Sequence, residues 1–466
     1  MLLEIFAHTL RKPDPLTPFQ LASICSSWLT IAFNTCELWS RVDLTLGITN
    51  YVARIELLSQ WIARAGVTPI YIKLRGDNSF GWYDIGCTET IRQLFDLIAL
   101  RQGQIRSLKV WLPTCWINIL DEKDLSWPNL SKLHISTSKD AQPIVLNKVP
   151  ARLFARSPAL KRLSIHNLFP SSFLLPWSNL LHLKLSSISP VEMCQALHWC
   201  KSLQTMSLDQ LIETDTPDDS SISSLPPISK NETLHSLEYL NIDGYQPYTT
   251  TNEALQRLLL PALKYLRLEL DAAPETMENN SDVPDDHLEL GEFAFGSEAP
   301  LQSLIICSTP LLEIDLLTTA LDAWNASLKH FELIDVALMP QDPPDISLLE
   351  QMTTDPTSFL PNLEVLIIRQ MNNSHLVMNP GDVFTMLKSR WPDPVKTPQP
   401  TDQTSVLRKV VLESNRMFEN VPPFTPAQEA TLKKWEEMGY ELVLNFRTLG
   451  GTIYLWNMGV VEHEMG

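Results

Sequence analysis

The side chains that could do chemistry in this chain lack the spacing that a catalytic or metal site needs. Cys194, His198 and Cys200 fall within seven residues, as metal ligands often do, but no second ligand pair accompanies them. Their apolar neighbours, Trp199 among them, favour a buried helix instead. This cluster is therefore interpreted as core rather than as a metal site.

Sequence motifs of enzymes are missing as well. The chain has no phosphate-binding glycine loop, no G-x-S-x-G and no H-E-x-x-H, and the terminal VEHEMG only shares letters with the last of these. Carboxylates are concentrated in loop-like stretches, whereas acid–base catalysis needs them paired on rigid elements. We expect no catalytic residue, no cofactor and no metal, which leaves a surface as the functional feature and an enzyme as a distant alternative.

Bulk composition describes a folded protein with a strong acidic bias. Of 466 residues, 44% are hydrophobic, and 36 Lys and Arg stand against 54 Asp and Glu, a net charge of −18. The length exceeds what one compact core normally spans. The charge argues against wholesale binding to nucleic acid or to an anionic membrane, and we expect neither as a partner.

The lack of recognisable sorting signals and the scattered cysteines predict an intracellular protein of the cytoplasm, the nucleus or both. No stretch approaches 18 apolar residues, and the opening MLLEIF lacks a basic leader and a small-residue cleavage site. Seven scattered cysteines without a C-x-x-C motif are typical of a reducing compartment.

One short pattern, L-x-x-L-x-[LI], recurs along the chain and must organise its elements. Neighbouring copies are 20 to 44 residues apart, and several follow a proline, as in WPNL, SPAL, LPAL and LPNL. Such periods indicate stacked units that bury their leucines only against one another. The copies begin at Leu130, Leu160, Leu180, Leu203, Leu237, Leu263, Leu301, Leu328 and Leu363, with weaker ones at Ile105 and Leu407.

These copies resemble leucine-rich repeats in their first six positions. The resemblance implies an α/β fold, a curved parallel sheet with outer helices and loops. The family usually places Asn three residues after the third apolar position, and here only Asn415 fits. An irregular solenoid without a full asparagine ladder is therefore expected over residues 47–466. A chance recurrence of LxxLxL in a leucine-rich chain is the alternative.

The first 46 residues are crowded with large apolar side chains at helical spacing. Thr17-Pro18-Phe19-Gln20 reads as a capping box that opens a helix with its apolar stripe at Leu21, Ile24, Cys25 and Trp28. Three short helices are expected in this stretch, and the third is expected to end near Asn34. Three helices of this length bury too little to be stable alone, so the repeats or another protein must cover them.

The stretch LLEIF…LASICSSWLTIAFNTCELWS resembles an F-box, in the version common in mushroom-forming fungi, where degenerate leucine-rich repeats follow it. The family usually begins with a Leu-Pro pair before this stretch, so the box is expected to be clipped here or to continue upstream of Met1. The resemblance implies that the box binds a Skp-type adaptor of an SCF-type ubiquitin ligase. It implies adaptor contacts at Leu2, Leu3, Ile5, Phe6, Leu21, Ile24, Cys25, Trp28 and Leu29.

Between the repeats, the sequence predicts helices and loops. Helices are expected at 50–65, 89–101 and Thr425–Met438, with capped starts at Ser189-Pro190-Val191-Glu192 and at Thr250 with Glu253. Strands are expected at 68–74, 105–112 and in ELVLNF and TIYLW near the end. Acidic loops are expected near 213–232 and 271–292, and a third loose stretch at 392–404.

The repeat register also lists the side chains that point away from the core. Early strands present basic residues, middle ones aromatic and polar residues, and later ones apolar residues. Tyr and Arg are frequent interface anchors. We expect a protein client at Lys132, Arg162, His166, His182, Lys184, Tyr239, Tyr265 and Arg267.

The resemblances together imply a substrate receptor that links an unknown protein client, through the adaptor, to a cullin-based ligase. Two alternatives remain. The first 46 residues could simply cap the solenoid, in which case the chain is a repeat scaffold that does not engage the adaptor. The outward face could be an ordinary solvated sheet.

Overall fold

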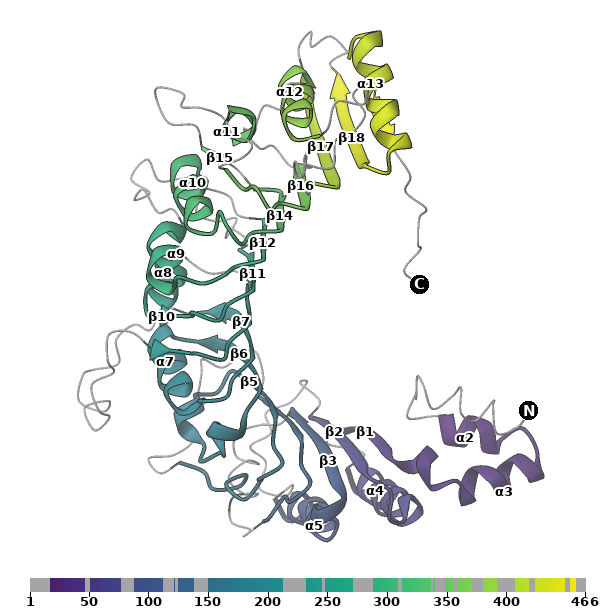
Figure 1. Ribbon diagram of the computed structural model, residues 1–466. Helices are drawn as coiled ribbons and strands as arrows, with labels where there is room; N and C mark the ends of the chain where they lie inside the picture. The colour runs from purple at the N-terminus through teal and green to yellow at the C-terminus, as the bar shows by residue number, and fades with distance from the viewer. Residues whose placement is uncertain are drawn as a thin grey trace, which may run out of the picture. The chain divides into compact units, whose positions relative to one another are not determined.

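The computed structural model describes the chain as two compact units, Met1–Leu203 and Gln204–Gly466 (Figure 1). The expected domain boundary after residue 46 lies within the first unit. The described residues are 17–46, 51–76, 88–111, 121, 125–137, 150–212, 232–244, 248–270, 288–308, 312–336, 338–339, 348–354, 359–370, 380–391, 407–418, 424–448 and 453–457.

The first unit contains a parallel sheet whose strands lie side by side in chain order. Each strand is joined to the next in register, apart from one irregularity at Ile70. The strands are β1 (Arg41–Leu46), β2 (Ile70–Gly76), β3 (Ile105–Trp111), β4 (Lys132–Ser136), β5 (Arg162–His166) and β6 (His182–Ile188). Its helices are α2 (Thr17–Ala22), α3 (Ser26–Asn34), α4 (Tyr51–Ala65), α5 (Thr88–Ala99) and α7 (Pro190–Trp199), with 3-10 turns η1 (Cys36–Trp39), η3 (Gln102–Gln104), η4 (Pro170–Ser172) and η5 (Trp177–Asn179).

The second unit repeats the same plan and ends in a hairpin. Its parallel strands are β7 (Thr205–Leu211), β9 (Tyr239–Asp243), β11 (Tyr265–Glu269), β12 (Ser303–Cys307), β14 (His330–Ile334), β16 (Val365–Gln370), β17 (Lys409–Phe418) and β18 (Glu441–Thr448). Strand β19 (Ile453–Asn457) pairs antiparallel with β18. Two short parallel pairs join β8 (Glu232–Thr233) to β10 (Leu258–Leu259) and β13 (Leu312–Glu313) to β15 (Leu338–Met339).

Three helices of the second unit lie on one side of its strands. Figure 1 shows α8, α9 and α10 in a row beside β7 to β14. The helices are α8 (Tyr248–Gln256), α9 (Leu290–Ser297), α10 (Ile314–Ala323), α11 (Leu348–Thr354), α12 (Pro380–Arg390) and α13 (Pro426–Glu437). Both units are therefore α/β with parallel strands added one after another, as a solenoid-like fold requires.

The apolar periodicity explains this architecture. Each of the eleven copies of L-x-x-L-x-[LI] coincides with a strand, as predicted. The repeated leucines are buried, for example Leu160, Leu163 and Ile165 in one copy. Because side chains alternate along a strand, the residues between them point to the opposite face.

In both units a residue with left-handed backbone conformation stands two positions after the third apolar residue of the pattern. It is Asn167, Ser187, Gln210, Gly244, Ser308 or Asp335, with φ between 52° and 114°. Its backbone amide bonds to the neighbouring strand in several cases, such as Ser308 N to Ile334 O at 2.7 Å. Positive φ favours Gly and Asn, whereas other L-residues adopt it at a cost. The next residue returns to the core, as Leu168, Ile188, Leu211 and Val336 do.

The start of a strand is fixed by shared carbonyls. The carbonyl of Ser131 accepts from the amides of Lys161 and Arg162, both at 3.1 Å. The same arrangement joins Glu238 O to the amides of Lys264 and Tyr265 at 2.9 and 3.0 Å. One acceptor thus serves two successive donors, so each strand sets the register of the next.

Asparagines before the repeat leucine tie successive turns together. Asn129 Nδ2 donates to Gly103 O at 2.6 Å, and Asn362 Nδ2 donates to Ala326 O at 2.8 Å. Asn179 makes the equivalent bond to Pro158 O at 3.3 Å. These three asparagines therefore stand one residue before the pattern, whereas Asn252 and Asn325 accept from backbone amides at other positions.

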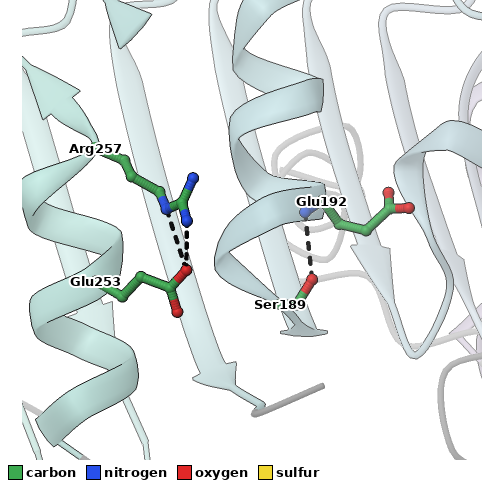
Figure 2. Close-up of polar contacts among 4 residues, drawn as sticks. All are labelled: Ser189, Glu192, Glu253 and Arg257. Atoms are coloured by element: carbon green, nitrogen blue, oxygen red, sulfur yellow. Dashed lines mark hydrogen bonds and ion pairs between the residues drawn. The ribbon is translucent and has the colours of Figure 1, made fainter. Parts of the chain in front are cut away.

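Helix starts agree with the sequence in part (Figure 2). Ser189 Oγ accepts from Glu192 N at 3.3 Å, as predicted for a cap. The Glu192 carboxylate, however, accepts from Ser171 Oγ at 2.8 Å, so the box is not closed by that side chain. The predicted start at Thr250 is wrong, because α8 already begins at Tyr248 and Glu253 instead pairs with Arg257 one turn later, at 2.7 Å.

Other expected elements fall close to their predicted ranges. Helices α4, α5 and α13 and strands β2, β3, β18 and β19 occur where the patterns indicated. The N-terminal helices are divided differently, because α2 stops at Ala22 and one helix, α3, covers Ser26–Asn34. The stretch 271–292 is not a loop throughout, since α9 begins at Leu290. Residues 213–231, 271–287 and 392–406 lie outside the described residues.

Candidate partner-binding surfaces

The segment made of α2, α3 and the turn between them leaves large apolar side chains in solvent. Ile24 is 58% exposed and Leu29 is 39% exposed, and Cys25 beside them is also exposed. Leu21 is buried within the unit, and Trp28 is half-buried. The other expected adaptor contacts, Leu2, Leu3, Ile5 and Phe6, lie outside the described residues. Exposed apolar side chains gathered on short helices are typical of a surface that another protein covers.

An aromatic cluster fixes these helices to the first repeat helix. Trp39 of η1 is fully buried, and its ring centroid lies 5.5 Å from Phe19 and 5.0 Å from Trp61 of α4. The guanidinium of Arg64, also on α4, lies over the rings of Phe33 and Trp39 at 4.6 and 4.7 Å. Edge-on aromatic pairs and cation–π contacts each stabilise such a junction by roughly 1 kcal/mol. The helical segment is thus packed directly against the repeats.

The outward face of β1 to β6 is strongly basic. Register pairing aligns Lys73, Lys109, His134, Ser164 and Lys184 in one row across five strands. A second row aligns the predicted client contacts Lys132, Arg162 and His182, and a third row contains His166. The face carries seven Lys or Arg residues and one carboxylate, namely Arg41, Lys73, Arg75, Lys109, Lys132, Arg162 and Lys184 with Asp43.

The predicted client contacts omit four of these cations, Arg41, Lys73, Arg75 and Lys109, because these lie on strands that precede Lys132. The alternation in TPIYIKL and IRSLKV carries the same signal and could have found Lys73, Arg75 and Lys109. Lys73 and Arg75 share the carboxylate of Asp43, at 3.1 and 2.9 Å. Arg41 lies over the ring of Tyr71, 5.2 Å from its centroid.

Burial and nearby cations lower the pKa values of two histidines on this face. Burial and the cationic neighbours Lys109, Lys184 and Lys73, with His166, lower the pKa of His134 to about 4. Burial, followed by Arg162 and Lys132, lowers the pKa of His182 as well. Both shifts have the sign expected where positive charge opposes protonation. His134 is therefore neutral near pH 7.

The outward face of the second unit is chemically different. Tyr239 and Tyr265 occupy paired positions, with ring centroids 6.4 Å apart, and they are 39% and 43% exposed. Arg267 pairs with Glu269 at 2.6 Å, and the hydrogen bond to this carboxylate raises the pKa of Arg267 despite its partial burial. These three predicted client contacts lie together, but in a separate unit from the basic ones.

Later strands of this face are more polar than predicted. Ile305, Ile334 and Val365 do occupy outward positions, but Cys307 and Ile367 are buried there. Polar contacts lie among them: His330 Nε2 is 3.2 Å from Glu332 Oε2, and ion pairs join Arg369 to Glu413 at 2.9 Å and Lys409 to Glu441 at 3.0 Å. The prediction of an apolar end is therefore wrong in part, because charged residues alternate with the aliphatic ones.

The cysteine and histidine cluster belongs to α7 and its end. Cys194 and Cys200 are buried, whereas His198 is exposed. Burial raises the pKa of the Cys200 thiol to about 12, which keeps it protonated. Among the described residues, no group of three or more His, Cys, Asp or Glu side chains is arranged to hold a metal ion.

Comparison with protein-family models and with curated proteins found no relative of this chain. No family model matches the chain, and no curated protein matches it significantly. None of the described helices combines the length and the apolar character needed to cross a bilayer.

Proposed function

We propose that the chain is a non-catalytic substrate receptor of an SCF-type ubiquitin ligase inside the cell. In this proposal residues 1–46 are an F-box that binds a Skp-type adaptor, and residues 47–466 are an irregular leucine-rich-repeat solenoid whose outward strand face binds a protein client. The receptor would act by proximity, raising the effective concentration of the client near the ubiquitin-charged enzyme.

One observation carries the proposal: Ile24, in the turn between α2 and α3, and Leu29, on α3, are exposed in a segment that is itself packed against the repeats. Apolar side chains in water are costly unless another surface covers them. The aromatic cluster of Phe19, Trp39 and Trp61, in which both tryptophans are buried, allows the helices to keep this surface in place. A helical segment serving only as a cap would bury Ile24 and Leu29 against the unit.

The test is co-purification of the full chain with a Skp-type adaptor. We expect wild type to bind and the double variant Ile24→Asp/Leu29→Asp to lose binding, because two carboxylates would be desolvated in the interface. Leu100→Asp is the matched control, since Leu100 is 78% exposed in the same unit but lies at the end of α5. It should bind like wild type.

Failure of folded wild type to bind the adaptor at micromolar concentration would overturn the proposal. The chain would then be a repeat scaffold, the alternative reading of the same elements. Circular dichroism of all three proteins separates loss of binding from loss of folding.

A further inference from the structure

Charge is divided very unevenly between the two units. Residues 1–203 contain 21 Lys and Arg against 14 Asp and Glu, a net charge of +7. Residues 204–466 contain 15 Lys and Arg against 40 Asp and Glu, a net charge of −25. The acidic character of the whole chain therefore conceals a basic unit.

Within that basic unit, like charges stand directly opposite each other on neighbouring strands. Lys73 is paired in register with Lys109, and Lys132 with Arg162. Facing like charges on a sheet destabilise it. Among the described residues, Lys109, Lys132 and Arg162 have no carboxylate within ion-pair distance. Asp43 partly compensates Lys73, but within the described residues no carboxylate compensates the repulsion between Lys132 and Arg162.

We propose that the outward face of β2 to β6 binds an extended, carboxylate-rich segment of a protein. The inference rests on the proposed function only in naming the client as the owner of that segment. The residues of this face that would bind the segment are Lys109, Lys132, Arg162 and Lys184. Their ammonium and guanidinium groups donate charge-assisted hydrogen bonds to Asp and Glu side chains.

The spacing of the cations suits a peptide that crosses the strands. Neighbouring strands are about 4.8 Å apart, so Lys109 on β3 and Lys184 on β6 are separated by about 14 Å. An extended segment of about four residues spans that distance. Lys109, Lys132, Arg162 and Lys184 are all exposed along this path, and the short side chain of Ser164 lies between His134 and Lys184.

A polynucleotide fits these observations less well. It would present a continuous line of phosphates whose length reaches beyond one short face, and the chain carries a net charge of −18. A short acidic segment is attracted only by the local cations, because salt screens charges beyond about 8 Å.

The probe is a fluorescein-labelled 12-residue peptide of alternating Glu and Ser, titrated with the full chain at low salt. We expect saturable binding that weakens as salt is raised from about 50 to 300 mM. The triple variant Lys109→Glu/Lys132→Glu/Arg162→Glu should lower the affinity at least about tenfold, since three attractions become repulsions. The control Arg152→Glu/Lys161→Glu/Lys201→Glu makes the same change of charge at exposed positions outside the strands and should lower it less than about threefold.

A single substitution tests the same face without reversing the charge at three positions at once. Lys132→Glu would face Arg162 with an opposite charge, so it should raise the melting temperature while weakening peptide binding. Equal binding by the triple variant and its control would overturn the proposal, as would tighter binding of a 12-nucleotide DNA strand than of the peptide. A lower melting temperature for Lys132→Glu would contradict the uncompensated repulsion on which the proposal stands.

Adaptor co-purification in parallel keeps the two proposals separate. The triple variant should retain the adaptor, and Ile24→Asp/Leu29→Asp should retain the peptide. Wild type that binds the peptide but not the adaptor contradicts the proposed function alone. Wild type that binds the adaptor, while the triple variant and its control bind the peptide equally, contradicts the basic binding face alone.

Discussion

The indole nitrogen of Trp39 donates a hydrogen bond to the backbone carbonyl of Ala32, 2.8 Å away. The bond joins η1 to α3 inside the aromatic cluster that packs the N-terminal helices on α4. Both residues are fully buried. An unpaired carbonyl at this depth would cost about 1–3 kcal/mol.

Trp39→Phe should therefore destabilise the first unit by about 2 kcal/mol, from the lost hydrogen bond and the smaller ring. Trp324→Phe is the matched control, because Trp324 is equally buried but its indole nitrogen has no hydrogen-bond partner. Urea unfolding of both variants measures the difference. Equal losses would show that the bond to Ala32 contributes nothing.

Gly244→Ala should destabilise the second unit by about 2–3 kcal/mol. Gly244 has φ +114°, and a Cβ there would lie 2.9 Å from the amide nitrogen of Gln210. Strained backbone and a backbone clash both oppose the substitution. Gly103→Ala should be tolerated, because nothing lies within 4 Å of its added Cβ. Thermal unfolding that ranked the two variants in the opposite order would contradict this assignment.

Arg390→Met should be among the most damaging single substitutions in the second unit, at about 3–5 kcal/mol. Arg390 is 2% exposed, and its guanidinium donates to the carbonyls of Met352 at 3.1 Å, Leu360 at 2.9 Å and Phe359. Methionine fills much of the space but leaves three buried acceptors unpaired. Lys388→Met, an exposed change on the same helix, is the control, and denaturant midpoints compare the two.

Stability of the first unit should fall as the pH is lowered from about 6.5 to 4. His134 has a folded pKa of about 4, below its ordinary value of 6.5, so the unfolded chain binds more protons in this window. The penalty should approach 1–2 kcal/mol after allowance for partial exposure, and His182 adds in the same direction.

His134→Gln should flatten this dependence, because glutamine does not titrate. His235→Gln, at an exposed site, controls for the loss of an imidazole. Unfolding free energies at pH 7.0, 5.5 and 4.5 provide the measurement. An unchanged slope in His134→Gln would place the titrating group elsewhere.

The repeats were predictable from sequence because their leucines are both periodic and buried. Leu160, Leu163 and Ile165 show the logic: their spacing fixes the strand and the inward face at once. Outward residues then follow by alternation, which is how Lys132 and Arg162 were placed. The same rule applied two strands earlier would have placed Lys73 and Lys109.

What escaped prediction depends on tertiary contacts. Nothing local distinguishes Gln210 or Ser308 as a left-handed residue, since neither type favours that conformation. Glu192 is drawn from its expected cap to Ser171 of a preceding turn. The end of α2 at Ala22, rather than near Trp28, similarly reflects packing that helix propensity does not encode.

The shared carbonyls at the strand starts have a consequence for how such a chain can evolve. Because the carbonyl before each strand aligns the start of the next strand, a whole turn can be duplicated or deleted without disturbing the hydrogen bonds between the strands on either side. Copies 20 to 44 residues apart already show that the intervening length is free to vary. New recognition specificities can therefore arise by recombination of entire turns, whereas a single-residue insertion within a strand would turn its leucines toward water.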